Sequence, residues 1–140
     1  MKLLLAADGS AYTQKALDFI IAHRHLLGDE RELLIVHAQM PLASGFNVIL
    51  GFDKAVELHT IEAEKVFKPL KKVLEKHAIK YRCITAIGPI VKEIVDTAKT
   101  ELVNIIVMGT HGRDWVASAV MGSVAQRVVA NSVIPVLLVK

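Results

Sequence analysis

Three glycines and a serine in the C-terminal part of the chain have the residue types and the spacing of an anion-binding site. Residues 109–123 read G-T-H-G-R-D-W-V-A-S-A-V-M-G-S, which places glycines at 109, 112 and 122 and a serine directly after the last. Glycine permits a sharp turn or the close approach of a ligand because it has no Cβ. Where a strand runs into a helix, exposed N–H groups and the positive end of the helix dipole attract anions. The segment therefore predicts a cradle for phosphate, to which the hydroxyl of Ser123 adds a donor.

The residues on both sides of this segment supply the required strand and helix. Residues 103–108 (VNIIVM) form an apolar run typical of a buried strand, and residues 123–131 follow a helical period. Ser123 and Gln126 have the spacing of a capping box, in which a serine at the helix start and a glutamine three residues later cap each other's backbone. This spacing independently predicts a helix N-terminus beside Gly122.

The same alternation of apolar runs and helical periods continues along the whole chain. We expect strands at residues 2–7, 32–38, 81–87, 103–108 and 134–139, and helices at residues 11–27, 52–77, 90–100 and 123–131. Strands that alternate with helices specify an α/β fold with a parallel sheet and right-handed crossovers. A chain of 140 residues has the size of one compact domain. The sequence therefore predicts a single doubly wound, Rossmann-like domain over residues 1–140.

Two parts of this pattern are less regular. The helix at residues 52–77 contains Pro69, which predicts a kink or a break near residues 66–68 because proline removes a backbone donor. Residues 39–51 contain a proline and two glycines without a clear period, which predicts a loop. His59 and His77 are expected on the surface of the helix, and its expected core face consists of Val56, Ile61, Val66, Phe67, Leu70, Val73 and Leu74.

An acidic turn follows the first predicted strand. Asp8, Gly9 and Ser10 come directly after that strand, as Gly109 follows the fourth. In open parallel sheets, ligands bind beyond the carboxyl ends of the strands, at the point where the strand order reverses. If the first and fourth strands are neighbours there, the acidic turn and the glycine cradle face one cleft. The alternatives are that Asp8 only caps the first helix, and that Gly109 and Gly112 only turn the chain.

Composition and charge argue against several other classes of protein. The net charge is +3, but the cations in residues 62–76 are interspersed with acids, as on a solvated helix face, and lack the aromatic interleaving of single-strand binders. No apolar run approaches the roughly 20 residues of a membrane span. The single cysteine, Cys83, excludes an intrachain disulfide and is typical of a reducing cytoplasm. We therefore expect a cytoplasmic protein that binds neither nucleic acid nor membrane, with Cys83 as a small buried residue.

The sequence lacks the usual motifs of catalysis and of metal binding. The P-loop pattern G-x4-G-K-[ST] and the dinucleotide pattern G-x-G-x-x-G do not occur, and no lysine follows Gly122. His23 and His25 point in different directions on a helix and make a poor zinc pair. His37 ends a strand near the predicted cleft and His111 lies between two glycines, so either can touch a ligand. Binding is better supported than catalysis, and we expect no metal held by the protein alone.

These features together resemble the universal stress protein family. Nucleotide-binding members carry the motif G-x2-G-x9-G-[S/T], which Gly109, Gly112, Gly122 and Ser123 match without a gap. The chain is also similar to the family in N-I-I-V-M-G-T-H-G around the first two glycines, in N-S-x-I-P-V-L-L-V near the C-terminus, and in the early A-D-G-S. The resemblance covers nearly the whole chain.

The resemblance implies a five-stranded sheet of order 3-2-1-4-5 with helices on both faces, and a homodimer formed through Ile134 to Val139. It also implies a site for ATP, with Mg²⁺ bound through the phosphates. Arg113 in that site could instead be an ordinary surface cation. The implied site consists of Ala7, Asp8 and Gly9 beside the adenine and ribose, Ala38 at the adenine through its backbone, Met108 and Gly109 along the nucleoside, Gly112, Arg113, Gly122 and Ser123 around the phosphates, and His111 and Val124 nearby.

The function implied by the resemblance is that of an ATP-binding regulatory dimer in the stress response, whose conformation or partners change with nucleotide occupancy. Three alternatives stay open. The chain could be a dimeric interaction protein with a vacant pocket, or a slow ATPase. It could also be an enzyme of the broader adenine-nucleotide-binding superfamily, although such enzymes need signatures like S-G-G-x-D-S where this chain has A-A-D-G-S.

Overall fold

The chain folds around one parallel five-stranded sheet. The computed structural model describes residues 1–28, 32–43, 45, 49, 51–112 and 121–140. The strand order is β3-β2-β1-β4-β5, and every neighbouring pair is parallel. The predicted α/β fold and the order 3-2-1-4-5 are therefore confirmed. The strands are β1 (Leu3–Ala6), β2 (Glu32–Gln39), β3 (Lys80–Ile87), β4 (Ile105–Gly109) and β5 (Val136–Val139).

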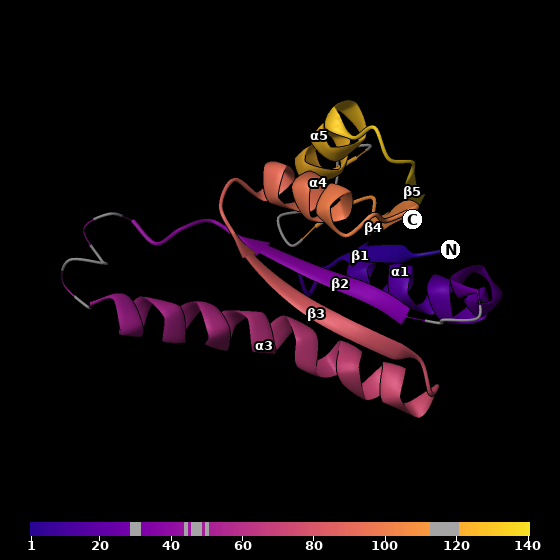
Figure 1. The fold of residues 1–140 in the computed structure, drawn as a ribbon, viewed down its shortest axis with the longest axis horizontal. Helices are drawn as coiled ribbons and strands as arrows, with labels where there is room; N and C mark the ends of the chain where they lie inside the picture. The colour runs from indigo at the N-terminus through magenta and orange to yellow at the C-terminus, as the bar shows by residue number, and fades with distance from the viewer. Residues whose placement is uncertain (29–31, 44, 46–48, 50, 113–120) are drawn as a thin grey trace.

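Helices cover both faces of this sheet (Figure 1). α1 (Ala11–Ala22) and α3 (Phe52–Lys76) pack on one face, and α4 (Ile90–Thr100) and α5 (Ser123–Asn131) pack on the other. A short 3-10 helix, η1 (Arg24–Leu27), replaces the last turn of the first predicted helix. Within the described residues, no helix is long and apolar enough to cross a membrane.

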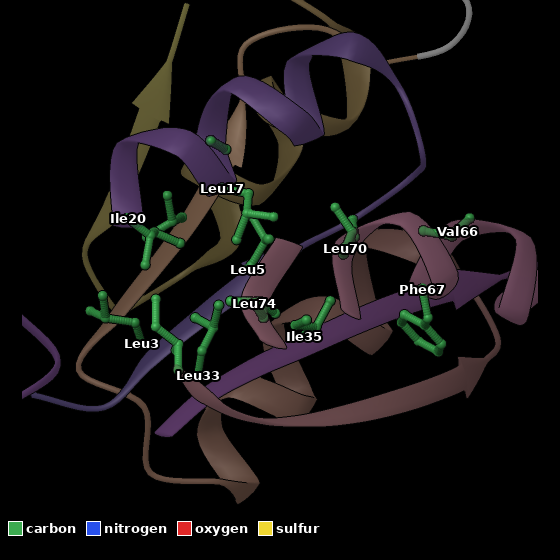
Figure 2. Packing of buried hydrophobic residues seen from close by; sticks show 14 of the residues in the cluster. Leu3, Leu5, Leu17, Ile20, Leu33, Ile35, Val66, Phe67, Leu70 and Leu74 are labelled. Carbon is green, nitrogen blue, oxygen red and sulfur yellow. The ribbon is translucent and has the colours of Figure 1, made fainter. Parts of the chain in front are cut away.

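The alternation of side chains along each strand divides the core into two layers. Leu3 and Leu5 of β1 face α1 and α3, whereas Leu4 and Ala6 face α4 and α5. Figure 2 shows the first layer, in which Leu5 lies near Leu17 of α1 and Leu3 lies near Ile20. Both faces of β1 are buried, which explains why its sequence is a continuous apolar run instead of an alternating one.

The expected break in the long helix and part of its expected core face are wrong. α3 continues from Phe52 to Lys76 with Pro69 inside it. Val56 and Ile61 are 46% and 45% exposed, and His59, expected on the surface, is only 8% exposed. The face of the helix that packs against the core includes small and polar residues. A prediction based on large apolar residues alone therefore placed the buried face at the wrong rotation about the helix axis. The buried residues are Ala55, His59, Ala63, Val66, Phe67, Leu70 and Leu74.

The N-terminus of α5 lies where the sequence predicts it, but without a capping box. Gly122 is the N-cap residue and Ser123 is the first helical residue, so the serine is one position too late to cap. Gln126 Nε2 donates to the carbonyl oxygen of Met121 at 3.3 Å instead. α1 has a side-chain cap, because Ser10 Oγ accepts from the backbone N–H of Thr13 at 3.3 Å.

Cys83 is less buried than expected. It lies in β3, paired with Ile35 in the register of the sheet, and is only partly covered. Partial burial raises the pKa of its thiol, because removal from water disfavours the thiolate. Such a thiol is less reactive than an ordinary one at neutral pH.

Candidate functional site

A cavity of about 630 Å³ lies at the carboxyl ends of β1, β2 and β4. This is the position where ligands bind in open parallel sheets, because β1 is paired with β2 on one side and β4 on the other. Gly9 is not among the lining residues, and Arg113 lies outside the described residues. The predicted residues that do line the cavity are Ala7, Asp8, His37, Ala38, Met108, Gly109, His111, Gly112, Gly122, Ser123 and Val124.

The acidic turn and the glycine segment meet across this cavity. β1 and β4 are paired from Leu3 with Ile105 to Ala6 with Met108, so the residues after both strands are neighbours. A Cβ built on Gly112 would lie 2.6 Å from Asp8 Oδ2. Residues of both segments line the same cavity, which confirms that the two segments face one cleft.

Hydrogen bonds fix one oxygen of the Asp8 carboxylate in the turn. Oδ1 accepts from the backbone N–H of Ser10 at 2.9 Å and from Thr13 Oγ1 at 2.7 Å. The backbone N–H of Asp8 donates back to Thr13 Oγ1 at 3.1 Å. Because Ser10 caps α1, Asp8 is not the helix cap, although it orders the turn. Gly9 adopts a φ of 78°, which a residue with a side chain rarely tolerates.

The three glycines of the motif permit close contacts within the protein. A Cβ on Gly109 would overlap the Cβ of Tyr12 and lie 3.0 Å from its carbonyl carbon, so this glycine lets α1 pack against β4. A Cβ on Gly122 would lie 3.3 Å from the Cα of His111 and from the oxygen of Thr110. The N–H of Gly122 donates to that oxygen at 2.7 Å and joins the two ends of the segment. Packing within the protein is thus a third reason for these glycines, beside the sharp turn and the close approach of a ligand that the sequence suggests.

His111 is fixed by the same close packing. Its ring lies 5.0 Å from the ring of Tyr12, and only 9% of the residue is exposed. Its Nδ1 lies 3.0 Å from Thr110 Oγ1. His111 therefore supports the loop between Gly109 and Gly112 as well as lining the cavity.

The opposite wall of the cavity consists of β2 and α3, and bonds between side chains and backbone hold it together. His37 Nδ1 lies 2.7 Å from the carbonyl oxygen of Ala7. Gln39 Nε2 donates to the carbonyl oxygen of His59 at 2.9 Å, and His59 Nδ1 lies 2.7 Å from Gln39 Oε1. An amide oxygen and a carbonyl oxygen can only accept, so Nδ1 carries the proton in both histidines.

Sequence reasoning missed Gln39 and His59. The signal for Gln39 is its position two residues after His37, which places both on the same face of β2. The signal for His59 is its place four residues after Ala55 and four before Ala63, on the buried stripe of α3. Both signals become legible only when the register between β2 and α3 is known.

An apolar slot and polar groups share the remaining surface of the cavity. Ile90 and Ile94 of α4 lie with Met108 along one side, next to Ala38. Other lining residues absent from the prediction are Ala6, Thr13, Val36, Glu62, Met121, Ala125 and Gln126. Within the described ranges, no group of three or more His, Cys, Asp or Glu side chains could hold a metal ion. The arrangement suits an organic anion that has a flat apolar part.

The comparisons with known proteins agree with this fold. A model of the Universal stress protein family matches residues 1–140. The chain is 33% identical over 152 residues to Universal stress protein MJ0577 of Methanocaldococcus jannaschii, over 99% of this chain and 94% of that protein. The solved structure of MJ0577 has a TM-score of 0.82 at 31% identity and covers 99% of this chain and 95% of that one.

Two further solved structures share the fold at lower identity. A universal stress protein family protein from Arabidopsis thaliana with AMP bound has a TM-score of 0.66 at 14% identity, over 100% of this chain and 92% of that one. A universal stress protein in complex with cAMP has a TM-score of 0.60 at 21% identity, over 99% of this chain and 95% of that one. Because the family model matches residues 1–140 and the chain is similar to MJ0577, the chain belongs to the universal stress protein family.

Proposed function

We propose that this protein binds ATP in the cavity and acts as a nucleotide-responsive regulatory dimer. The observation that carries the proposal is the meeting of three features in one cavity of about 630 Å³: the glycine segment, the Asp8 carboxylate and the apolar slot beside Ala38. This volume is within the range of about 300–1,000 Å³ that small-molecule sites occupy. The AMP and cAMP carried by two proteins of the same fold support a nucleotide as the ligand.

Each part of the nucleotide has a matching group in the cavity. The adenine would lie between Ile90, Ile94 and Met108, with its edge toward the backbone of Ala38. The ribose hydroxyls would donate to the Asp8 carboxylate, which accepts hydrogen bonds but would repel phosphate. The phosphates would lie at Gly112, Gly122 and Ser123, where the N-terminus of α5 opens into the cavity.

Mg²⁺ would bind through the nucleotide. Among the described residues the cavity wall contains the carboxylates of Asp8 and Glu62 but no cluster that could hold a metal by itself. Mg²⁺ prefers phosphate oxygens together with water. The triphosphate and water molecules would therefore coordinate the ion, without a ligand from the protein. The single cysteine favours a cytoplasmic location for such a protein.

The proposed dimer would form through Ile134 to Val139. β5 is an edge strand, and all four of its residues are only partly buried. Val133, just before it, is 82% exposed. An uncovered apolar edge favours association with a second chain.

Nucleotide content and titration test the binding proposal directly. We expect purified protein to release an adenine nucleotide on denaturation, or to give binding heat when titrated with Mg-ATP. Gly112→Ala should weaken ATP binding about 5- to 150-fold, because its Cβ would collide with a carboxylate that Ser10 and Thr13 hold in place. The matched control is Gly88→Ala, whose Cβ meets only the flexible side chain of Glu93 outside the cavity. Absence of both bound nucleotide and titration heat would refute the proposal and favour an interaction protein with a vacant pocket.

Light scattering tests the dimer separately. Val133→Asp should convert a dimer into a monomer that keeps its fold, because it adds charge to an exposed residue beside β5. Leu102→Asp, at a position that is 81% exposed and distant from β5 in sequence, is the control. A wild-type monomer, or a Val133→Asp dimer of unchanged stability, would contradict the edge-strand interface.

A further inference from the structure

The backbone of Ala38 lies where the pairing between β1 and β2 ends. The N–H of Ala7 donates to the oxygen of Val36 at 2.9 Å, so the peptide groups of Val36 point toward β1. The oxygen of Gln39 accepts from the N–H of Gly88 at 2.8 Å, on the β3 side. Peptide groups alternate in direction along a strand, so those of Ala38 point toward β1 like those of Val36.

The next hydrogen bond of this ladder is not formed. In a regular parallel pair, the N–H of Ala38 would donate to the oxygen of Ala7. That oxygen instead accepts from His37 Nδ1 at 2.7 Å. Among the described residues, no backbone hydrogen bond outside the sheet ladders involves the N–H or C=O of Ala38, and Ala38 lines the cavity.

The His37 side chain is held in the position from which it bonds to the Ala7 oxygen in place of the Ala38 N–H. Only 8% of the residue is exposed, and its ring meets the ring of Phe67 edge-on at 6.2 Å between centroids. Because a carbonyl oxygen only accepts, Nδ1 carries a proton in both the neutral and the charged imidazole. The bond to Ala7 is therefore available in either charge state.

We infer that His37 is a positioning residue for base recognition, which occupies the carbonyl of Ala7 and so leaves the backbone N–H of Ala38 for a ring nitrogen of the ligand. The inference rests on the proposed function. A strand residue with an open N–H and an open C=O presents one donor beside one acceptor. The adenine edge presents the complement, an acceptor ring nitrogen at N1 beside a donor amino group at N6. The ligand class is thus a nucleotide whose base has this edge.

The test compares two ligands on three proteins. In the wild type, ATP should bind about 3- to 10-fold more tightly than 1-deaza-ATP, which lacks the N1 acceptor. In His37→Phe, which keeps a ring and loses the donor, the N–H of Ala38 can close on Ala7, and this ratio should fall to about one. His37→Asn retains an N–H near the position of Nδ1 and should keep the wild-type ratio.

A structural role alone would weaken both ligands equally and leave the ratio unchanged, which would overturn the inference. A wild-type ratio of one would do so as well. Failure of the wild type to bind ATP at all would instead refute the proposed function.

Hydrogen exchange gives a readout without ligand. The Ala38 amide should exchange rapidly in the unliganded wild type and in His37→Asn, and it should become protected in His37→Phe as the ladder bond forms. Equal exchange in all three proteins would overturn the inference even if the phenylalanine variant bound no nucleotide.

Discussion

The two walls of the cavity are built in opposite ways. In the glycine wall, formed by residues 109–112 and 122–123, missing side chains allow backbone and neighbouring residues to approach, as at Gly109 against Tyr12. In the β2 wall, formed by residues 37–39 with α3, side chains are essential because His37 and Gln39 bond to backbone groups of other segments. Added atoms should therefore disrupt the glycine wall, and removal of hydrogen-bond donors should disrupt the β2 wall.

The largest effect should follow from adding a branched side chain to the glycine wall. The Cβ of Gly122→Val would lie 3.3 Å from the oxygen of Thr110, and its methyl groups would force the segment away from the start of α5. Overpacking of this kind costs about 1–3 kcal/mol, so we expect ATP affinity to fall up to about 150-fold while the dimer persists. Calorimetric titration and light scattering measure the two effects. Unchanged ATP affinity would show that the joined ends of the segment do not shape the site.

Gly109→Ala should separate folding from binding within the same wall. Its Cβ would overlap the Cβ of Tyr12, so α1 would have to move away from β4. We expect the free energy of unfolding in urea to fall by about 1–3 kcal/mol. Tyr12→Gly combined with Gly109→Ala should be less destabilised than the sum of the two single variants, since glycine at residue 12 removes the colliding Cβ. A Gly109→Ala protein as stable as the wild type would mean that this glycine serves the ligand alone.

The contrast between the walls also explains which parts of the site the sequence could reveal. The spacing of Gly109, Gly112 and Gly122 is local, so it was visible in the sequence together with the strand and helix around it. The packing reasons for these glycines were not visible, because Tyr12 and Asp8 lie about a hundred residues away in the chain. The pairing of Gln39 with His59 was hidden because it depends on the register between β2 and α3.

The long helix shows the physical origin of the errors in the fold. The positions of the strands follow from runs of apolar residues, which are strong signals because both sheet faces are buried. The strand order came from the resemblance to the family. The face of α3 was misjudged where the core accepts alanine and a bonded histidine while Val56 and Ile61 face solvent. Large apolar residues mark the buried face of a helix only where large side chains fill the space against the sheet. Where small residues fill that space, they do not.

The β2 wall should respond to loss of a donor with a moderate change. His59→Leu removes the N–H that Gln39 Oε1 accepts and leaves that oxygen short of a partner. We expect a loss of about 1–2 kcal/mol in the free energy of unfolding, measured in urea. Replacing both partners, with Gln39→Met and His59→Leu, should restore most of it, because no polar group is then left unpaired. His77→Leu, at the exposed C-cap residue of α3, is the control. Equal losses in the single and double variants would mean that packing, not the hydrogen bond, holds this wall.

The smallest effect should come from a charge cluster at the opposite end of the sheet, which belongs to neither wall. Glu101 accepts hydrogen bonds from Arg82 and, at 3.3 Å, from Lys2. These bonds lower the pKa of the Glu101 carboxyl from 4.5 to about 2, and the bond from Arg82 has the largest effect. Because the folded pKa is lower than the unfolded one, the carboxylate stabilises the fold above about pH 4.5, and this contribution disappears as the pH falls toward 2. Exposed ion pairs contribute little, so Glu101→Gln should slightly reduce stability at pH 7 and flatten the decline of stability between pH 4.5 and 2.

ATP affinity of Glu101→Gln at pH 7 should stay unchanged, since Lys2 precedes β1 and the cavity lies beyond the other end of β1. A change in ATP affinity in this variant would show that the sheet transmits strain to the cavity, so that neither wall acts independently of the rest of the fold.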